Sequence, residues 1–225
     1  MRPVDKGAST TTYNAYQNAR NDLCLKIGWY CSYCEMTIRN MPEVEHVIPV
    51  NQGGPSLDWD NFLVSCKYCN VNKKDYNPGR INYYWPDQDN TFRAFEYKRG
   101  FPITASSLLG SSQKKIAETT INLCGLDKEP GAQKSPTPKD TRWISRKDTW
   151  DLALESLKDW ETSQTSQMAK QVARTAAGTG HFSIWMEVFK NYKQVRYELL
   201  SIFPGTDHNC FDNNLQPIHR QGGNL

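Results

Sequence analysis

Two short stretches of the sequence, CSYC at residues 31–34 and CKYC at residues 66–69, decide the fold of its N-terminal part. Each has the C-x-x-C spacing that lets two thiolates reach a single point, and two such pairs supply the four ligands of a tetrahedral zinc ion. We therefore predict one structural zinc ion that holds the residues between the pairs in a compact unit. The four predicted ligands are Cys31, Cys34, Cys66 and Cys69.

The total of 7 cysteines is odd, and the other three stand singly. Residues 1–12 lack the apolar segment of a secretory signal, so we expect the chain in the reducing cytoplasm, where structural disulfides are rare. Two redox-active pairs, or thiols that merely pack in a core, remain the alternatives to zinc. The three cysteines without an assigned role are Cys24, Cys124 and Cys210.

The composition is that of a globular protein of 225 residues, with 38% hydrophobic and 12% aromatic residues. Its 27 Lys and Arg exceed its 24 Asp and Glu only slightly, and the formal net charge is +3. No apolar stretch approaches the roughly 20 residues of a membrane-spanning helix, so we expect no membrane association. These values exclude collagen-like, wholly disordered, histone-like and integral-membrane proteins.

Hydrophobic periodicity and turn residues divide the chain into two parts. We predict an α+β fold, with the cysteine pairs in residues 1–100 and a mostly α-helical region in residues 101–225. A linker rich in Pro, Lys and Gly is expected at residues 129–140. The predicted helices cover residues 12–27, 69–74, 109–123, 150–160, 164–177 and 184–203, and the predicted β segments cover residues 44–49 and 91–97.

Polar residues suited to phosphodiester hydrolysis lie between and beside the cysteine pairs. The side chain of His46 is an imidazole, a base that can take a proton from water. Glu45 offers a carboxylate to a hard cation such as magnesium, and Asn61 and Asn70 offer amide oxygens. Lys73 can neutralise a phosphate. Taken singly these would be ordinary surface, turn or helix-cap residues, and only their order within one unit indicates chemistry.

The combined pattern resembles the HNH endonucleases, also called ββα-metal nucleases, over about residues 29–75. The resemblance implies that residues 1–100 are an HNH nuclease domain with an N-terminal helix and a zinc-stapled ββα unit. The matching residues are Cys31-x-x-Cys34, Glu45-His46-x-Ile48-Pro49, Gly53-Gly54, Trp59-Asp60-Asn61-Phe62 and Cys66-x-x-Cys69-Asn70-x-x-Lys73.

The resemblance also implies a role for each site residue. His46 matches the general base that deprotonates the attacking water, and Asn61 matches the asparagine that braces the loop and helps to orient that base. Glu45 and Asn70 match the ligands of a catalytic Mg²⁺ or Mn²⁺, which makes the chain an H-N-N variant. Adjacent residues of a strand point to opposite faces, so we expect Glu45 and His46 at a strand end where the pleat is irregular.

The expected reaction is metal-dependent hydrolysis of DNA, with RNA left open as a substrate. Lys73, Lys74 and Arg80 are predicted to contact phosphate groups, the alternative being a solvated basic face. Small HNH proteins of this build resemble nuclease effectors of bacterial anti-phage systems, so a regulatory protein such as an ATPase or sensor is expected to bind the helical region. Restriction, mobile-element and repair roles are alternatives, as is a non-catalytic zinc-bearing module that binds nucleic acid or acts as an adaptor.

Overall fold

The computed structural model describes residues 1–225 and has the predicted mixture of helices and small sheets. The α-helices are α1 (Arg20–Ile27), α2 (Lys67–Lys73), α3 (Thr91–Ala94), α4 (Ser111–Cys124), α5 (Arg142–Thr162), α6 (Ser166–Thr179), α7 (Phe182–Val188) and α8 (Lys193–Ile202). Short 3-10 helices are η1 (Tyr16–Ala19), η2 (Val50–Gln52), η3 (Trp59–Asn61) and η4 (His208–Cys210). The strands are β1 (Glu43–His46), β2 (Phe62–Ser65), β3 (Phe95–Glu96) and β4 (Thr104–Ala105), which form two antiparallel ribbons, β1–β2 and β3–β4.

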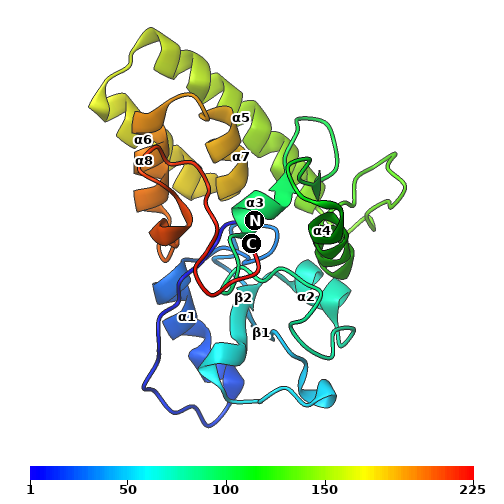
Figure 1. Cartoon of the computed structure of the whole chain (residues 1–225). Coiled ribbons are helices and arrows are strands. Elements are labelled where there is room, and N and C mark those ends of the chain that lie inside the picture. The colour runs from blue at the N-terminus through cyan, green and yellow to red at the C-terminus, as the bar shows by residue number, and fades with distance from the viewer.

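The ribbon of β1 and β2 is the centre of the N-terminal part (Figure 1). Its register pairs Glu43 with Ser65 and His46 with Phe62. Helix α1 lies on one side of the ribbon and α2 on the other, and all four residues of β2 are buried. Because side chains alternate along a strand, successive residues of β1 face different helices.

Most of the predicted helices are confirmed, with ends shifted by a few residues, except that the helix predicted from residue 150 begins eight residues earlier, at Arg142. The first begins with the 3-10 turn η1, continues as α1 and stops at Gly28, whose φ of 82° is incompatible with a continued helix. Helix α4 ends in the same way at Gly125, which is left-handed. Helices α2, α5 and α6 correspond to the remaining predicted segments before residue 180. None of the helices combines the length and apolar character that crossing a membrane requires.

The strand predicted over residues 91–97 is largely wrong. The structure has one helical turn, α3, followed by the two-residue strand β3. The Asn90 side chain donates to two carbonyls of the C-terminal segment, and the Thr91 hydroxyl donates to the carbonyl of Met1 at 2.9 Å. These tertiary contacts fix the turn and outweigh the strand propensity of the segment.

The single helix predicted over residues 184–203 is divided into α7 and α8 by a turn at residues 189–192. Tyr192, at this turn, packs edge-on against Trp160 of α5, with 6.0 Å between ring centroids. Its ring also packs against Phe189, at 6.3 Å. The turn lets α8 pack against α6, and burial of the aromatic side chains outweighs helix continuity.

One continuous core of 50 buried hydrophobic residues runs through both predicted parts of the chain. The N-terminal stretch helps to join them. The guanidinium of Arg2 donates to the carbonyl of Ile27 at 2.5 Å and to that of Pro204 at 2.6 Å. The helical region is therefore packed against the cysteine-bearing part, and the loop at residues 129–140 runs along the outside.

A substitution at Gly180, which lies between α6 and α7, would test the packing of the helical region against the cysteine-bearing part. The φ of Gly180 is +78°, and a Cβ there would lie 2.4 Å from the carbonyl oxygen of Glu35, next to the first cysteine pair. Gly180→Ala should therefore lower the free energy of unfolding in urea by about 1–3 kcal/mol. Gly178→Ala is the matched control, because Gly178 is an exposed residue of α6 and a Cβ added there would meet no atom within 4 Å. This variant should gain about 0.5–1 kcal/mol of unfolding free energy. Equal effects of the two substitutions would contradict the close approach.

Candidate metal centre and active site

The sulfur atoms of the two cysteine pairs meet at one buried point. All four Sγ atoms lie within 4.8 Å of one another, and each cysteine is at most 3% exposed. The sulfurs of Cys34 and Cys66 are 3.7 Å apart. Tetrahedral coordination with Zn–S bonds of about 2.3 Å requires about 3.8 Å. The predicted set therefore fits a closed, structural zinc site with no position for a substrate.

Two tight turns present these sulfurs. In the first, the amide of Glu35 donates to the carbonyl of Cys31 at 2.9 Å, and the left-handed φ of Glu35, 64°, closes the turn. In the second, Cys66 caps α2, and its sulfur accepts a hydrogen bond from the Cys69 amide at 3.4 Å. Burial opposes ionisation of Cys31, but hydrogen bonds from the other three thiols hold its pKa well below the ordinary value. Hydrogen bonds from Cys31 and burial raise the pKa of Cys34, so without a metal the set favours one thiolate, at Cys31.

Arg142, from the start of α5, supplies positive charge beside the sulfurs. It is 1% exposed, and its Nη1 lies 3.1 Å from the sulfur of Cys69. Asp140 fixes the guanidinium through two hydrogen bonds of 2.8 and 2.7 Å. A zinc ion with four thiolates has a net charge of −2, which Arg142 partly neutralises. The sequence carried no signal for this residue, because it lies 73 positions from the nearest ligand and belongs to no motif.

Glu45 points into the protein on the α2 face of β1. Its side chain is 1% exposed, and its carboxylate lies 2.5 Å from Nζ of Lys73. It also accepts a hydrogen bond from the hydroxyl of Tyr33. Burial and the adjacent carboxylate raise the pKa of Tyr33 well above its ordinary value, so the phenol stays protonated and donates. Glu45 is therefore held in an internal ion pair.

Lys73 is the buried partner of Glu45 in this ion pair. Its side chain is 1% exposed, and besides Glu45 it donates to the carbonyl of His46 at 2.8 Å. Lys73 follows Cys69 by four residues, so both lie on one face of α2, and that face is turned inward by the metal centre. This position contradicts the predicted contact between Lys73 and a phosphate group.

Asn70 contacts Glu43. Its Nδ2 donates to Oε2 of Glu43 at 2.8 Å, and both residues are half-buried, whereas no hydrogen bond joins Asn70 to Glu45. Glu43 and Glu45 are two residues apart on β1 and share the face toward α2. Oxygen donors suited to a hard cation are therefore grouped on this face. Glu43 was not among the predicted ligands, although the alternation of the Glu43-Val44-Glu45 stretch could have indicated it.

His46 lies on the opposite face of the ribbon, at the last position of β1. Its ring packs against Tyr16, at 4.8 Å between centroids, and against Phe62, at 5.2 Å. Its Nε2 is 3.0 Å from the carbonyl oxygen of Ser56. Glu45 and His46 are both in regular register with β2, so the irregular pleat expected there is absent and the two side chains diverge.

Asn61 braces the loop between the two strands. Its Oδ1 accepts from the amide of Ile48 at 2.8 Å, and its Nδ2 donates to the carbonyls of Ile48 and Pro55, both at 2.9 Å. The residue is 3% exposed. The loop that it closes also carries Ser56, the contact of His46.

The other two predicted phosphate contacts differ in their exposure. Lys74 is exposed beside the ring of Tyr76. Arg80 is half-buried and binds both carboxylate oxygens of Asp87 at 2.9 Å. Burial favours the neutral form of Asp87, but Arg80 and Lys6 hold its pKa below the ordinary value. Of the three predicted cations, Lys74 is the one that faces solvent without an acidic partner.

Residues 31–76 match the family model described as HNH endonuclease. The chain carries an HNH endonuclease domain. The matched segment contains β1, β2 and α2 in ββα order, the four cysteines and every predicted site residue except Arg80. No curated protein matches the chain. The HNH domain indicates a nuclease, and the cysteine cluster indicates its structural zinc.

The metal centre predicts a defined zinc content. The purified protein should hold one zinc ion per chain by atomic emission spectroscopy, and Cys66→Ala should lose both the zinc and the fold of the HNH domain, because a structural zinc contributes folding free energy. Cys210→Ala is the control, since Cys210 is buried but lies outside the cluster and its substitution should leave the zinc in place. Full zinc occupancy in Cys66→Ala would overturn the assignment.

The buried ion pair predicts a large difference between two neighbouring lysines. Lys73→Met leaves the carboxylate of Glu45 buried without its cation and should cost about 3–5 kcal/mol of unfolding free energy. Lys74→Met removes an exposed charge and should change stability by less than about 0.5 kcal/mol. Urea denaturation followed by circular dichroism measures both. Similar losses in the two variants would show that Lys73 is not paired as the structure has it.

Proposed function

We propose that the chain is a metal-dependent endonuclease that hydrolyses phosphodiester bonds in DNA. The observation that carries the proposal is the setting of His46 within the matched HNH segment. The ring is half-buried at the end of β1, and a backbone carbonyl fixes one of its nitrogens.

The contact with Ser56 determines how His46 would act. A carbonyl oxygen only accepts, so in the neutral ring Nε2 carries the proton and Nδ1 keeps its lone pair. Nδ1 makes no hydrogen bond with the protein, which leaves it able to accept a proton from water. His46 would then be the general base that generates the attacking hydroxide.

Asn61 is a positioning residue in this proposal. Its side chain makes three hydrogen bonds across the loop and none to His46. It would act by holding the loop so that the carbonyl of Ser56 stays 3.0 Å from the imidazole. The role implied by the family resemblance for the middle asparagine is consistent with these contacts.

The oxygen donors on the α2 face fit a hard cation such as Mg²⁺ or Mn²⁺. Asn70 and Glu43 would hold it in place of the expected pair Glu45 and Asn70, because Lys73 occupies the carboxylate of Glu45. When bound, such an ion stabilises the negative charge on the scissile phosphate and on the leaving 3′-oxygen. His46 is the last residue of β1. A nucleic-acid backbone that passes the end of this strand would therefore reach both the imidazole on one face and the oxygen donors on the face toward α2.

A second candidate is a zinc-bearing module that binds nucleic acid without cutting it. The pairing of Glu45 with Lys73 favours this candidate, because it occupies the carboxylate that was predicted to bind the catalytic metal. No match connects the chain with anti-phage defence or with an ATPase or sensor, and these stay predictions from the resemblance.

The two candidates differ in one assay. Supercoiled plasmid DNA should be nicked or cut in the presence of Mg²⁺ or Mn²⁺, and His46→Ala should lower the rate by at least about 100-fold while zinc content and the circular dichroism spectrum are unchanged. His208→Ala is the control, since His208 is exposed and lies outside the HNH segment. Wild-type activity in His46→Ala would refute the proposed base. DNA left intact by wild-type protein that binds it would favour the non-catalytic module.

A further inference from the structure

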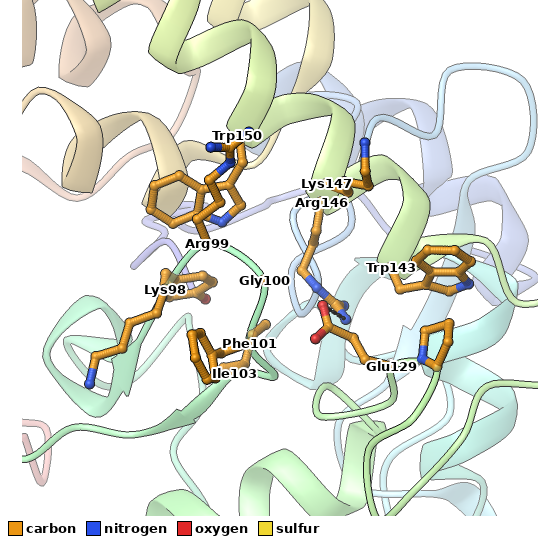
Figure 2. A pocket seen from close by; sticks show the side chains of 12 residues that line it. Lys98, Arg99, Gly100, Phe101, Ile103, Glu129, Trp143, Arg146, Lys147 and Trp150 are labelled. Atoms are coloured by element: carbon orange, nitrogen blue, oxygen red, sulfur yellow. Dashed lines mark hydrogen bonds and ion pairs between the residues drawn. The ribbon is translucent and has the colours of Figure 1, made fainter.

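A cleft of about 200 Å³ lies between the loop after β3 and the outer side of α5 (Figure 2). Residues 97–103 form one wall and residues 143–150 of α5 form the other, while Glu129 closes the floor. None of the residues that line the cleft belongs to the matched HNH segment. The cleft is therefore separate from the site described above.

Two aromatic side chains of the cleft take no part in the core. Phe101 is 65% exposed, and Trp143 is half-buried without packing against the core cluster. Trp150, seven residues after Trp143 on α5, lies on the same side of the helix (Figure 2). Large apolar rings gathered in one hollow at the surface are typical of a binding site.

Four cations line the same cleft, against one carboxylate. Lys147, between the two tryptophans in sequence, and Arg99, on the opposite wall, both bind Asp151 outside the cleft, at 2.9 and 2.6 Å. These ion pairs are largely exposed and therefore weak, so an anion can take the place of Asp151. The cleft thus offers positive charge beside aromatic faces.

Arg146 is a buried cation in the lining of the cleft. It is 4% exposed, and its terminal nitrogen pairs with Glu129 at 3.4 Å and with the carbonyl of Lys128 at 3.0 Å. Its Nε is buried and has no hydrogen-bond partner in the protein. A buried donor without a partner is costly, so the protein leaves this guanidinium of the lining incompletely satisfied.

We propose that this cleft binds one unpaired nucleotide, with its base in contact with both Trp143 and Phe101 and its phosphate facing Arg99 and Lys147. Every base has a π-face, so stacking of this kind accepts any sequence. The volume is below the 300–1,000 Å³ of typical small-molecule sites, which suits a single base better than a large cofactor. A paired base is excluded, because its faces are covered within the double helix. The inference rests on the proposed function only in taking nucleic acid as the partner.

Binding of a labelled oligothymidylate, measured by fluorescence anisotropy on the His46→Ala protein, tests the cleft without interference from cleavage. Phe101→Ala and Trp143→Ala should each raise Kd about tenfold, the loss expected for one base–aromatic stack. Tyr197→Ala is the matched aromatic control, because Tyr197 is 60% exposed on α8, outside the cleft. Lys147→Glu should also weaken binding, whereas Lys158→Glu, an exposed lysine farther along α5, should not.

The source of the nucleotide is distinguished by competition with AMP. Displacement of the oligonucleotide by AMP would assign the cleft to free nucleotides, and failure of AMP to compete would assign it to a nucleotide within a strand. Unchanged Kd values in both Phe101→Ala and Trp143→Ala would overturn the proposal. It would also be overturned if a blunt DNA duplex bound as tightly as the oligothymidylate and lost as much affinity in these two variants. Wild-type protein that leaves plasmid intact, yet shows the Phe101- and Trp143-dependent binding, would overturn the proposed nuclease function alone.

Discussion

Four sulfur atoms that share one point determine the arrangement of the elements around them. Closing a metal site with Cys31 and Cys66 brings two turns together across the ribbon of β1 and β2. It also fixes the rotation of α2, because Cys66 caps this helix and Cys69 must point inward from its first turn. The same cluster contacts the helical region through Arg142, so a metal held by the four cysteines would join the two parts of the chain as well as fold the first.

The rotation of α2 decides which side chains can do chemistry. With Cys69 turned inward, Lys73 also points inward and its ammonium finds the carboxylate of Glu45. A carboxylate at 1% exposure requires such a partner, since the cost of desolvating an isolated charge would exceed any packing gain. On the other face of β1, His46 meets aromatic rings and a carbonyl and has no charged partner. Because side chains alternate along β1, the structural ion pair of Glu45 and Lys73 lies on one face of the strand and the proposed base His46 on the other.

The sequence predicted those features that depend on short-range spacing. The C-x-x-C pairs indicated the metal centre, and the helices predicted to end at residues 27 and 123 end at Ile27 and Cys124. It could not predict the partners of single polar residues, because these depend on the rotation of one element against another. Lys73 was expected at the surface because its inward position depends on the rotation of α2. The division of residues 184–203 was not predicted because Tyr192 contacts Trp160 of a distant helix. The role of Asn61 as a loop brace was implied by the resemblance and not by spacing, and its side chain bonds to Ile48 and Pro55 of that loop.

The net charge of +3 is small, and the burial of charged residues hardly changes it, which bears on nucleic-acid binding. Six basic and five acidic side chains are buried, among them Lys73, Arg142 and Glu45, so the exposed surface is close to neutral overall. Contacts with phosphates bring counterion release, which supplies most non-specific affinity, and a nearly neutral surface offers few such contacts. Affinity must then come from local groupings of cations or from stacking, which does not depend on net charge. The cleft beside α5 combines both, and it lies on the helical region while the proposed base lies on the HNH domain. A strand held at both places would be bound by the two parts that the metal centre joins.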